Sequence, residues 1–309
     1  MKSPRRTHDS LTILSVLLGL ATGASAAPAT KHGQEVPTTS VAGQPQVERF
    51  STALAAFEQI LRVPARVLAF GEYHQTHSTV DIRSALARFT DEILPALAGS
   101  ATDLVVETWV STGACGAKEA KVDRDVGATT LRPAETESEI VTLLKRAKTA
   151  GLQPHILTMS CEDYRGVMGA RGETDFAKLL KLTRRRLQSE VSRCLAEPPA
   201  HGGQGHRVVA VYGGALHNDL HPAPSDRRYA FGPALSTAVK GQYVEVDLLV
   251  PEYVATDRRL AREPWFGLIE RNKTSKDILL IRRGERSFAI LFPPSKPSEP
   301  KPEEARPEQ

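Results

Sequence analysis

The chain has 309 residues, of which 40 % are apolar, 25 % charged and 6 % aromatic. These proportions are those of an ordinary globular protein, and they exclude a fibrous, collagen-like or fully disordered chain. The formal charge is +4, and it falls to +2 (37 basic minus 35 acidic residues) once a predicted N-terminal leader is removed. Binding nucleic-acid phosphates takes concentrated Lys and Arg. We therefore expect no nucleic-acid partner, and we interpret the one dense basic run, 184–186, as a solvated helix face.

The N-terminus has the pattern of a secretory signal peptide. Basic residues near the start are followed by an apolar run at 11–20 and by the small residues Ala24, Ser25 and Ala26. This pattern predicts a signal peptide at 1–26, cleaved near Ala26, and export to the periplasm or the cell exterior. No cysteine follows the cleavage point, so we expect no lipid anchor there. No other stretch approaches the ~20 apolar residues that a membrane-spanning helix needs, so we expect no transmembrane segment.

Composition divides the rest of the chain into three parts. Residues 27–46 are rich in Pro, Thr, Gly and Gln, and residues 293–309 carry six prolines among charges, so both are predicted to be disordered. Between them, residues 47–292 show no repeat at a fixed period. We expect this body to form a single domain.

Within the body, apolar strand-like runs alternate with helical periods, which is typical of an α/β fold. In chain order, the predicted helices cover 51–61, 80–94, 136–151 and 175–195, and the predicted strands cover 65–70, 104–106, 154–158, 207–212, 243–250, 278–281 and 288–291. Thr136 and Glu139 have the spacing of a capping box, and Gly151 is the expected stop of that helix. The last two strands form a closing hairpin. We expect one central, mostly parallel sheet flanked by helices, with a C-terminal β-hairpin.

The three cysteines are Cys115, Cys161 and Cys194. An oxidising compartment permits one disulfide and leaves one thiol over, and the sequence does not choose the pair. Their spacing matches no zinc motif. We interpret the thiols as buried or bridged rather than catalytic.

Polar residues collect at the predicted carboxyl ends of four strands, in the segments 71–74, 107–108, 162–163 and 213–219. In open α/β sheets, ligands bind beyond these strand ends, because loops converge there on a rigid frame. This recurrence predicts a functional cleft at one edge of the sheet.

Two Gly-x-x-His segments, 71–74 and 214–217, each follow a strand. We expect the glycine to allow a sharp turn, and the histidine to point back over the sheet edge. His74 and His217 with Glu107 would form a three-ligand site for a divalent metal (Zn, Mn or Co) that acidifies its water. Alternatively, the histidines act as general bases without a metal. Glu72 would assist proton transfer or orient a ligand.

The other polar residues are given structural roles. His77 and His221 are interpreted as helix-start and loop residues, and 162–165 as a structurally paired segment. Three more histidines lie away from the predicted edge and are set aside: His155, His201 and His206.

The strand–GEYH–helix segment, the strand that ends in Glu107 and the late Gly-x-x-His217 resemble the superfamily that joins the erythromycin esterases, the Tiki and TraB proteins and the ChaN-like haem-binding uptake proteins. The resemblance covers about Arg66 to Asp219. It implies an α/β fold with two GxxH histidines and a strand-end glutamate around one cleft. Asn218 is the candidate amide partner that the resemblance suggests for the catalytic histidine.

The branches of that superfamily imply different activities. Similarity to the esterase branch implies a histidine that activates water, and similarity to the Tiki branch implies a metal-dependent peptidase. We therefore expect an exported hydrolase that acts on a small molecule or a peptide, with His74, His217 and Glu72 as catalytic residues. The alternative, implied by the ChaN-like branch, is a haem-binding uptake protein that dimerises and binds iron through Tyr73 and His74. A third hypothesis is a family member that only binds a partner protein.

Overall fold

The computed structural model describes residues 45–198, 207–255 and 257–295. The predicted signal peptide and nearly all of the linker and tail lie outside the described residues, as do His201 and His206. The strands are β1 (Gln46–Phe50), β2 (Val67–Glu72), β3 (Asp103–Thr112), β4 (Gln153–Ser160), β5 (Val209–Gly214), β6 (Tyr243–Leu249), β7 (Ile278–Arg282) and β8 (Ser287–Leu291). The helices are α1 (Ala53–Leu61), α2 (Ala85–Arg88), α3 (Leu94–Leu97), α4 (Ala117–Thr130), α5 (Glu135–Thr149), α6 (Cys161–Gly166), α7 (Phe176–Ala196), α8 (Ala215–Asn218), α9 (Gly232–Ala238), α10 (Pro251–Val254) and α11 (Gly267–Arg271). Short turns of other helix types are η1 (His77–Thr79), η2 (Phe89–Ile93) and η4 (Leu260–Arg262).

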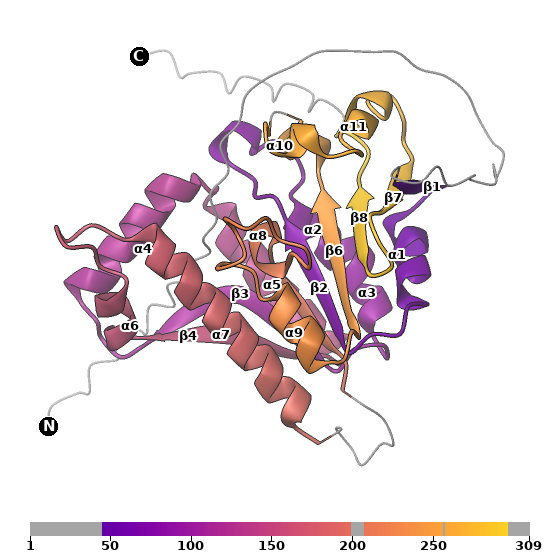
Figure 1. Ribbon diagram of the computed structural model, residues 1–309. Helices are drawn as coiled ribbons and strands as arrows, with labels where there is room; N and C mark the ends of the chain where they lie inside the picture. Colours follow the sequence, from indigo (N-terminus) through magenta and orange to yellow (C-terminus); the bar gives the residue numbers. More distant parts are fainter. Residues whose placement is uncertain (1–44, 199–206, 256, 296–309) are drawn as a thin grey trace, which may run out of the picture.

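All eight strands belong to one sheet in the order β1-β7-β8-β6-β2-β5-β3-β4 (Figure 1). The pairs β2–β5, β2–β6, β3–β4, β3–β5 and β6–β8 are parallel, whereas β7 is antiparallel to both β1 and β8. The predicted α/β class with a mostly parallel sheet and a C-terminal hairpin is therefore confirmed. Strand β1 was not predicted, because it is a largely exposed edge strand of sequence QVERF without an apolar pattern.

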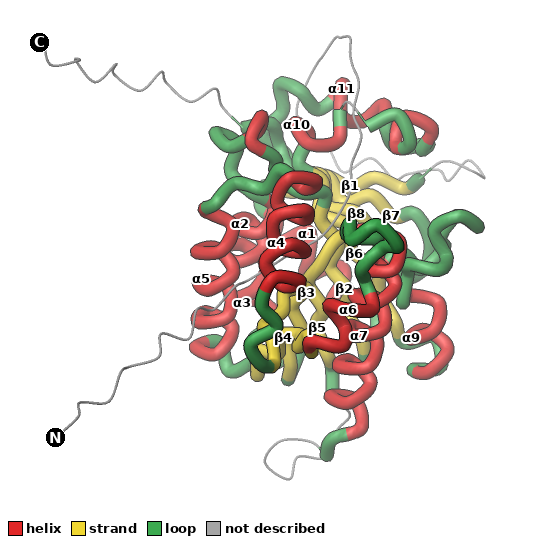
Figure 2. Tube along the Cα trace, turned by 90° about the vertical axis from the view of Figure 1, so that its left-hand side faces the viewer, coloured by secondary structure: helices red, strands yellow, loops and turns green. Residues whose placement is uncertain are grey.

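Helices cover both faces of the sheet, as the two views show (Figures 1 and 2). Successive side chains along a strand point to opposite faces of the sheet, so the apolar core consists of one cluster on each face. One face, which carries Leu68 and Phe70 of β2, packs on α1, α2, α3 and α5. The other face, which carries Val67 and Ala69, packs on α4, α7 and α9. A third apolar cluster around Trp265 covers β7 and β8.

The helices differ from the prediction in several places. The helix expected from residue 80 begins at Ala85. Pro95 does not end the helical segment, because the π-helical turn η2 precedes it and Pro95 lies in the first turn of α3. The capping box predicted for α5 is wrong, since Glu139 accepts a hydrogen bond from the Ser84 hydroxyl at 2.7 Å instead. Gly151 does follow α5 with φ +86°, as a helix stop requires. Helix α4 was not predicted, and neither were the short helices α6, α8, α9, α10 and α11. No described helix is long and apolar enough to cross a membrane.

A disulfide joins Cys115 and Cys161, and Cys194 is a free, buried thiol. The bond links the segment after β3 to the first residue of α6, across a separation of 46 residues. The expectation of one pair and one leftover thiol is thus met, and the structure identifies the pair.

Candidate functional site

The carboxyl ends of β2 and β5 and a bulge inside the neighbouring strand β3 enclose a small cavity. In β2, β5 and β3 the register places Glu72 opposite Gly214 and Val106 opposite Tyr212. This is the edge at which open α/β sheets bind ligands. The space that the centre of a water molecule can occupy in this cavity is about 10 Å³, which is close to the minimum for one bound water. It is lined by Glu72, His74, Leu86, Val106, Glu107, Arg132, Ile140, Tyr212, Gly213 and Gly214.

Glu72 and His74 form a hydrogen-bonded pair at the end of β2. Nδ1 of His74 lies 2.5 Å from Oε1 of Glu72, and both side chains are less than a tenth exposed. We assign the proton to Nδ1, because a carboxylate oxygen accepts, and this leaves Nε2 as the basic nitrogen. Burial raises the pKa of Glu72, although the charge of Arg132 and the hydroxyl of Tyr212 oppose the rise. The pair has the arrangement of a carboxylate-oriented general base.

Arg132 and Tyr212 complete the surroundings of Glu72, and neither was predicted. The Tyr212 hydroxyl donates to Oε2 of Glu72. Nη2 of Arg132 donates to Oε1 of Glu72 at 2.9 Å and to Nε2 of His74 at 2.9 Å, and it also contacts Nδ1 of His74. Tyr212 lies within an apolar strand and looks like a core residue, whereas Arg132 follows the unpredicted helix α4. The one usable signal was that Tyr212 directly precedes two glycines at a strand end.

Backbone contacts tie the segments that carry Arg132 and His74 together. Helix α4 ends at Thr130, and Leu131 takes a left-handed conformation with φ 52°. That conformation costs a non-glycine residue about 1 kcal/mol. The Leu131 carbonyl accepts the N–H of His77 at 2.8 Å. Backbone strain is thus present at the residue that precedes the guanidinium of this cavity.

Glu107 and His217 form a second buried pair beside the first. The predicted strand end at Glu107 is wrong, because β3 continues to Thr112 and Glu107 lies inside it, in a bulge that inserts two residues relative to β4. Its Oε2 accepts the N–H of Gly214 at 2.8 Å, and its Oε1 lies 3.6 Å from Nε2 of His217. Nδ1 of His217 donates to the Tyr229 carbonyl at 2.6 Å, so Nε2 faces Glu107 without a proton. Burial raises the pKa of Glu107 well above its ordinary value and lowers that of His217 to about 4, which favours the uncharged form of each.

The two pairs reach the sheet edge from opposite faces. Glu72 continues the row of Leu68 and Phe70, which packs on the α5 side, whereas His217 bonds the backbone of Tyr229, whose ring packs on the α7 side. In the part of the chain that the structure describes, His74, Glu107 and His217 do not bring their ligand atoms within 4.8 Å of one another. The three predicted metal ligands are therefore not assembled into one site.

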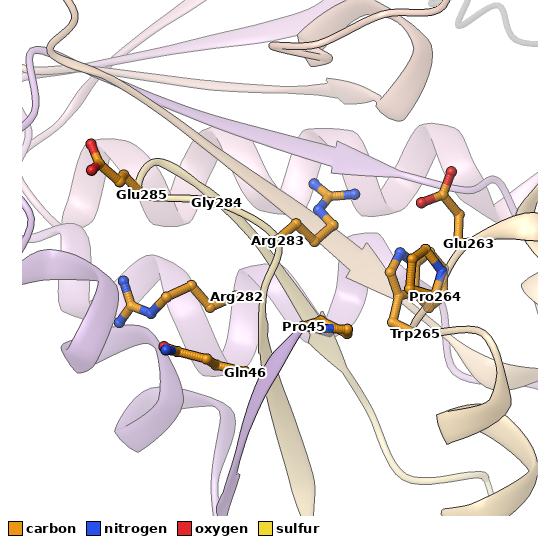
Figure 3. A pocket seen from close by; sticks show the side chains of 9 residues that line it. All are labelled: Pro45, Gln46, Glu263, Pro264, Trp265, Arg282, Arg283, Gly284 and Glu285. Atoms are coloured by element: carbon orange, nitrogen blue, oxygen red, sulfur yellow. The ribbon is translucent and has the colours of Figure 1, made fainter. Parts of the chain in front are cut away.

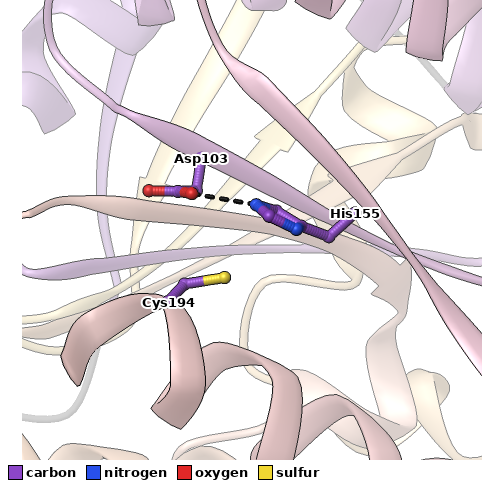
Figure 4. A group of neighbouring side chains, drawn as sticks. All are labelled: Asp103, His155 and Cys194. Carbon is purple, nitrogen blue, oxygen red and sulfur yellow. Dashed lines mark hydrogen bonds and ion pairs between the residues drawn. The ribbon is translucent and has the colours of Figure 1, made fainter. Parts of the chain in front are cut away.

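One group of three candidate metal ligands does occur among residues 45–198, 207–255 and 257–295, at the opposite edge of the sheet. Asp103, His155 and Cys194 hold ligand atoms within 4.8 Å of one another (Figure 4). His155, which the sequence analysis set aside, lies 2.9 Å through Nε2 from Oδ1 of Asp103. Arg207 donates to both carboxylate oxygens of Asp103, at 2.9 and 2.8 Å, and so balances its charge. Burial raises the pKa of Cys194 to about 12, which disfavours the thiolate that a metal would bind.

Tyr73 has different neighbours from His74, although the two are adjacent in sequence. It packs against the apolar cluster over β7 and β8 and does not line the cavity. Burial, followed by the charge of Asp247, raises the pKa of Tyr73 well above its ordinary value. Asp247 is itself bonded to Arg283 at 2.7 Å. The phenol therefore keeps its proton in the free protein, whereas ligation of ferric iron would require the phenolate.

A wider hollow of about 750 Å³ lies at the turn between β7 and β8, beside Trp265 (Figure 3). Its two arginines already have partners. Arg282 lies over an aromatic ring of β8, and Arg283 donates to Asp247 at 2.7 Å and to Glu245 at 2.9 Å. None of the predicted site residues lines this hollow, so we assign it no role in the chemistry.

The remaining predicted polar residues have structural contacts or lie apart. Asp163 caps α6 with Ser160 and accepts a hydrogen bond from Arg186, which supports the structural pairing expected for this segment. His77 starts the turn η1, and His221 is exposed in a loop. Neither of these histidines lines the cavity.

Gly71 and Gly213 lie where another side chain crosses the strand. A Cβ atom at Gly71 would lie 2.6 Å from the Asn218 amide, and one at Gly213 would lie 2.5 Å from Oε2 and 2.8 Å from Cβ of Glu107. Neither glycine has a positive φ, and both belong to strands. The expected turn role of Gly71 is therefore wrong, because this glycine is required for close approach.

We predict that Gly213→Ala destabilises the protein by about 2 kcal/mol, because the added methyl group displaces Glu107 from the strand. Gly127→Ala is the matched control. Gly127 lies inside α4 with open space around its Cα, so alanine should stabilise that helix by about 1 kcal/mol. Urea unfolding of both variants measures the two changes. Equal stability of Gly213→Ala and wild type would contradict the close packing of Glu107 on β5.

The lowered pKa of His217 predicts acid destabilisation in a defined pH window. The folded protein binds fewer protons at His217 than the unfolded chain between pH 6.5 and about 4. The resulting stability is full above pH 6.5 and is lost as the pH falls toward 4, with a total of about 3 kcal/mol. Urea unfolding at pH 7 and pH 4.5 should show this loss in wild type and a smaller one in His217→Asn, which keeps a donor for Tyr229. An identical pH dependence of the free energy of unfolding in both proteins would show that His217 does not cause the acid destabilisation.

The chain was compared with known families, curated proteins and solved structures, and no family model, curated sequence or solved structure matches it.

Proposed function

We propose that this protein is a hydrolase that cleaves ester or amide bonds with a general base formed by His74 and Glu72. The observation that carries the proposal is the 2.5 Å hydrogen bond between Nδ1 of His74 and Oε1 of Glu72, inside a cavity at the carboxyl ends of β2 and β5 beside the bulge of β3. Membership of the superfamily of the erythromycin esterases and Tiki proteins is part of the proposal. It is supported by the two Gly-x-x-His segments at the ends of the neighbouring strands β2 and β5, and by Glu107 in the bulge of β3 beside β5.

In this mechanism Nε2 of His74 removes a proton from a water molecule as that water attacks a substrate carbonyl. Glu72 holds the ring in the required tautomer and stabilises the imidazolium that forms. Tyr212 donates to the second oxygen of Glu72 and so fixes the carboxylate. The room for about one water beside these groups fits this role.

Two further groups supply the charge and the proton that acyl transfer needs. Arg132 lies 2.9 Å from both Nε2 of His74 and Oε1 of Glu72, where a fixed cation stabilises the oxyanion as it develops. Glu107 lines the same cavity, and its raised pKa suits a general acid that protonates the leaving group. The proton that His74 removes from the water then returns to Glu107, since both residues line the cavity, and this restores both groups for the next turnover.

A metal-assisted version of the reaction has weaker support. Glu107 and His217 offer two ligands, and the Nδ1–H of His217 is oriented by the Tyr229 carbonyl as in many metal sites. Catalytic zinc takes three protein ligands, and His74 lies outside that pair's reach. The residues as placed do not fit Zn²⁺, Mn²⁺ or Co²⁺ as the sequence predicted, so we derive no step through a metal.

The haem alternative and the partner-binding alternative have no supporting contact at this cavity. A Soret band on haem titration that disappears in His74→Ala would favour haem uptake over hydrolysis. Export to an oxidising compartment remains part of the proposal, and it is supported by the Cys115–Cys161 disulfide, a bond that is rare in reducing compartments.

The proposal is tested with a chromogenic short-chain ester and a chromogenic peptide amide. We expect wild type to hydrolyse at least one of them in the presence of EDTA, and His74→Ala to lose roughly 100-fold or more. His77→Ala, a change at an exposed neighbouring histidine, is the matched control and should keep full activity. Hydrolysis that persists in the His74→Ala, His217→Ala double variant would refute the assignment.

A further inference from the structure

A charged hollow lies between α6 and α7, at the carboxyl end of the outermost strand β4. We name it the α6–α7 cleft and define it by Glu162, Asp163, Lys178, Lys181, Arg185 and Arg186, which line a volume of about 450 Å³. This volume is within the range of small-molecule sites. The two helices lie side by side at this end of the sheet (Figure 2). None of the residues of the proposed active site lines the cleft.

Part of the charge in the cleft is cancelled internally. Asp163 accepts from the backbone N–H of Ser160 at 2.8 Å, from its hydroxyl at 2.9 Å, and from the guanidinium of Arg186. Although burial opposes it, these hydrogen bonds hold the pKa of Asp163 below its ordinary value. Asp163 and Arg186 therefore form a neutral pair that makes one wall of the cleft rigid.

The remaining charge is positive and has few partners. Lys178 donates to the Met168 carbonyl at 3.0 Å and lies 3.6 Å from Asp175. Lys181 and Arg185 make no ion pair and no side-chain hydrogen bond with any residue in the described ranges. Glu162 is the one uncancelled acid that lines the cleft. The net charge of the predicted mature chain is only +2, so this local excess is not a consequence of overall composition.

Helix geometry makes this arrangement unfavourable without a ligand. Lys178, Lys181 and Arg185 have the spacing i, i+3, i+7, which places them on one face of α7, and like charges at such spacings repel one another. A multivalent anion in the cleft would relieve this repulsion, and it would accept charge-assisted hydrogen bonds from both a planar guanidinium and an ammonium group.

We propose that the α6–α7 cleft binds a phosphate-bearing anion. Phosphate offers several acceptor oxygens and about two negative charges, which matches the unpaired Lys181 and Arg185 together with Lys178. The phosphate comes either from a free ligand or from a lipid headgroup, and the experiment separates the two sources. The inference does not depend on the proposed hydrolysis, because it rests on different residues.

The test measures binding of inorganic pyrophosphate by titration calorimetry, and retention by phosphatidylglycerol vesicles in a flotation assay. We expect wild type to bind pyrophosphate saturably, and Lys181→Glu/Arg185→Glu to weaken binding by about tenfold per side chain. Lys145→Glu/Lys148→Glu on α5 is the matched control, with the same change of charge at exposed lysines, and it should bind within roughly twofold of wild type. Thermal melts verify folding. If the glutamate variants fold poorly, the corresponding glutamine pairs replace them.

Loss of vesicle retention in the cleft variant but not in the control supports the proposal with a lipid headgroup as the source. Pyrophosphate binding without vesicle retention supports it with a free phosphate. An equal loss of binding in the cleft and control variants would show non-specific attraction and overturn the proposal. The absence of saturable binding of either probe by wild type would also overturn it.

Discussion

Replacing Glu72 by glutamine is expected to lower kcat/KM for ester or amide hydrolysis by roughly 10³-fold. Glu72 accepts the Nδ1 proton of His74 at 2.5 Å, and this acceptor fixes the tautomer in which Nε2 is basic. A glutamine amide can offer its NH₂ group to Nδ1, which would place the proton on Nε2 and remove the base. The volume of the side chain hardly changes, so the fold should be preserved.

The control for this experiment is Tyr212→Phe. It removes the hydroxyl that donates to the other oxygen of Glu72 but leaves the bond to His74 in place. We expect a loss of about tenfold, since only the fixation of the carboxylate is weakened. Steady-state kinetics of the three proteins between pH 5 and 9 give the comparison. Equal activity of Glu72→Gln and wild type would remove Glu72 from the mechanism, whatever the role of His74.

Loss of the Cys115–Cys161 disulfide is expected to lower the free energy of unfolding by about 4 kcal/mol, because the bond closes a loop of 46 residues in the unfolded chain. For a chain of this size the change corresponds to a fall in Tm of roughly 10 °C. The bond joins the end of β3 to α6 and does not line the active-site cavity. Activity at low temperature should therefore survive.

The measurement is thermal unfolding of wild type and of Cys115→Ser/Cys161→Ser, each with and without a reductant. Wild type should lose stability when the reductant is added, and the double variant should not respond to it. The buried Cys194 is present in both proteins and serves as an internal control. A response of the double variant to reductant would show that the effect has another origin.

The parts of the fold that apolar pattern predicts are the buried ones. Seven strands were predicted from their apolar runs: β2, β3 and β5 to β8 are mostly buried, whereas β4 is a partly exposed edge strand. Strand β1 was missed because it is an exposed edge. Helix α4 was missed because only three of its 14 residues, Val122, Val126 and Thr130, are buried. The end of the helix 80–94 was misplaced because a π turn lets Pro95 begin a new turn.

Only those residues of the candidate site that lie on or directly after a predicted strand could be predicted from the sequence. Glu72 and His74 at the end of β2 share one cavity with Glu107 of β3, because only β5 separates the two parallel strands. Arg132 comes from a loop whose place depends on tertiary contacts with the His74 segment, so no local pattern indicates it. The approach of His217 from the opposite face depends on how α8 packs over Gly71. The spacing of residues along the chain does not indicate from which face of the sheet His217 approaches.

The sheet order also constrains when the protein can fold during its synthesis. Strand β2 pairs with β5 and β6, and β1 pairs with β7, with partners such as Gln46 and Arg282 more than two hundred positions apart. A nascent chain that ends before β5 leaves the central strand with both edges open, so stable tertiary structure has to wait until most of the polypeptide has left the ribosome. Such late folding would keep the chain in a translocation-competent state and would lengthen the time during which it depends on chaperones.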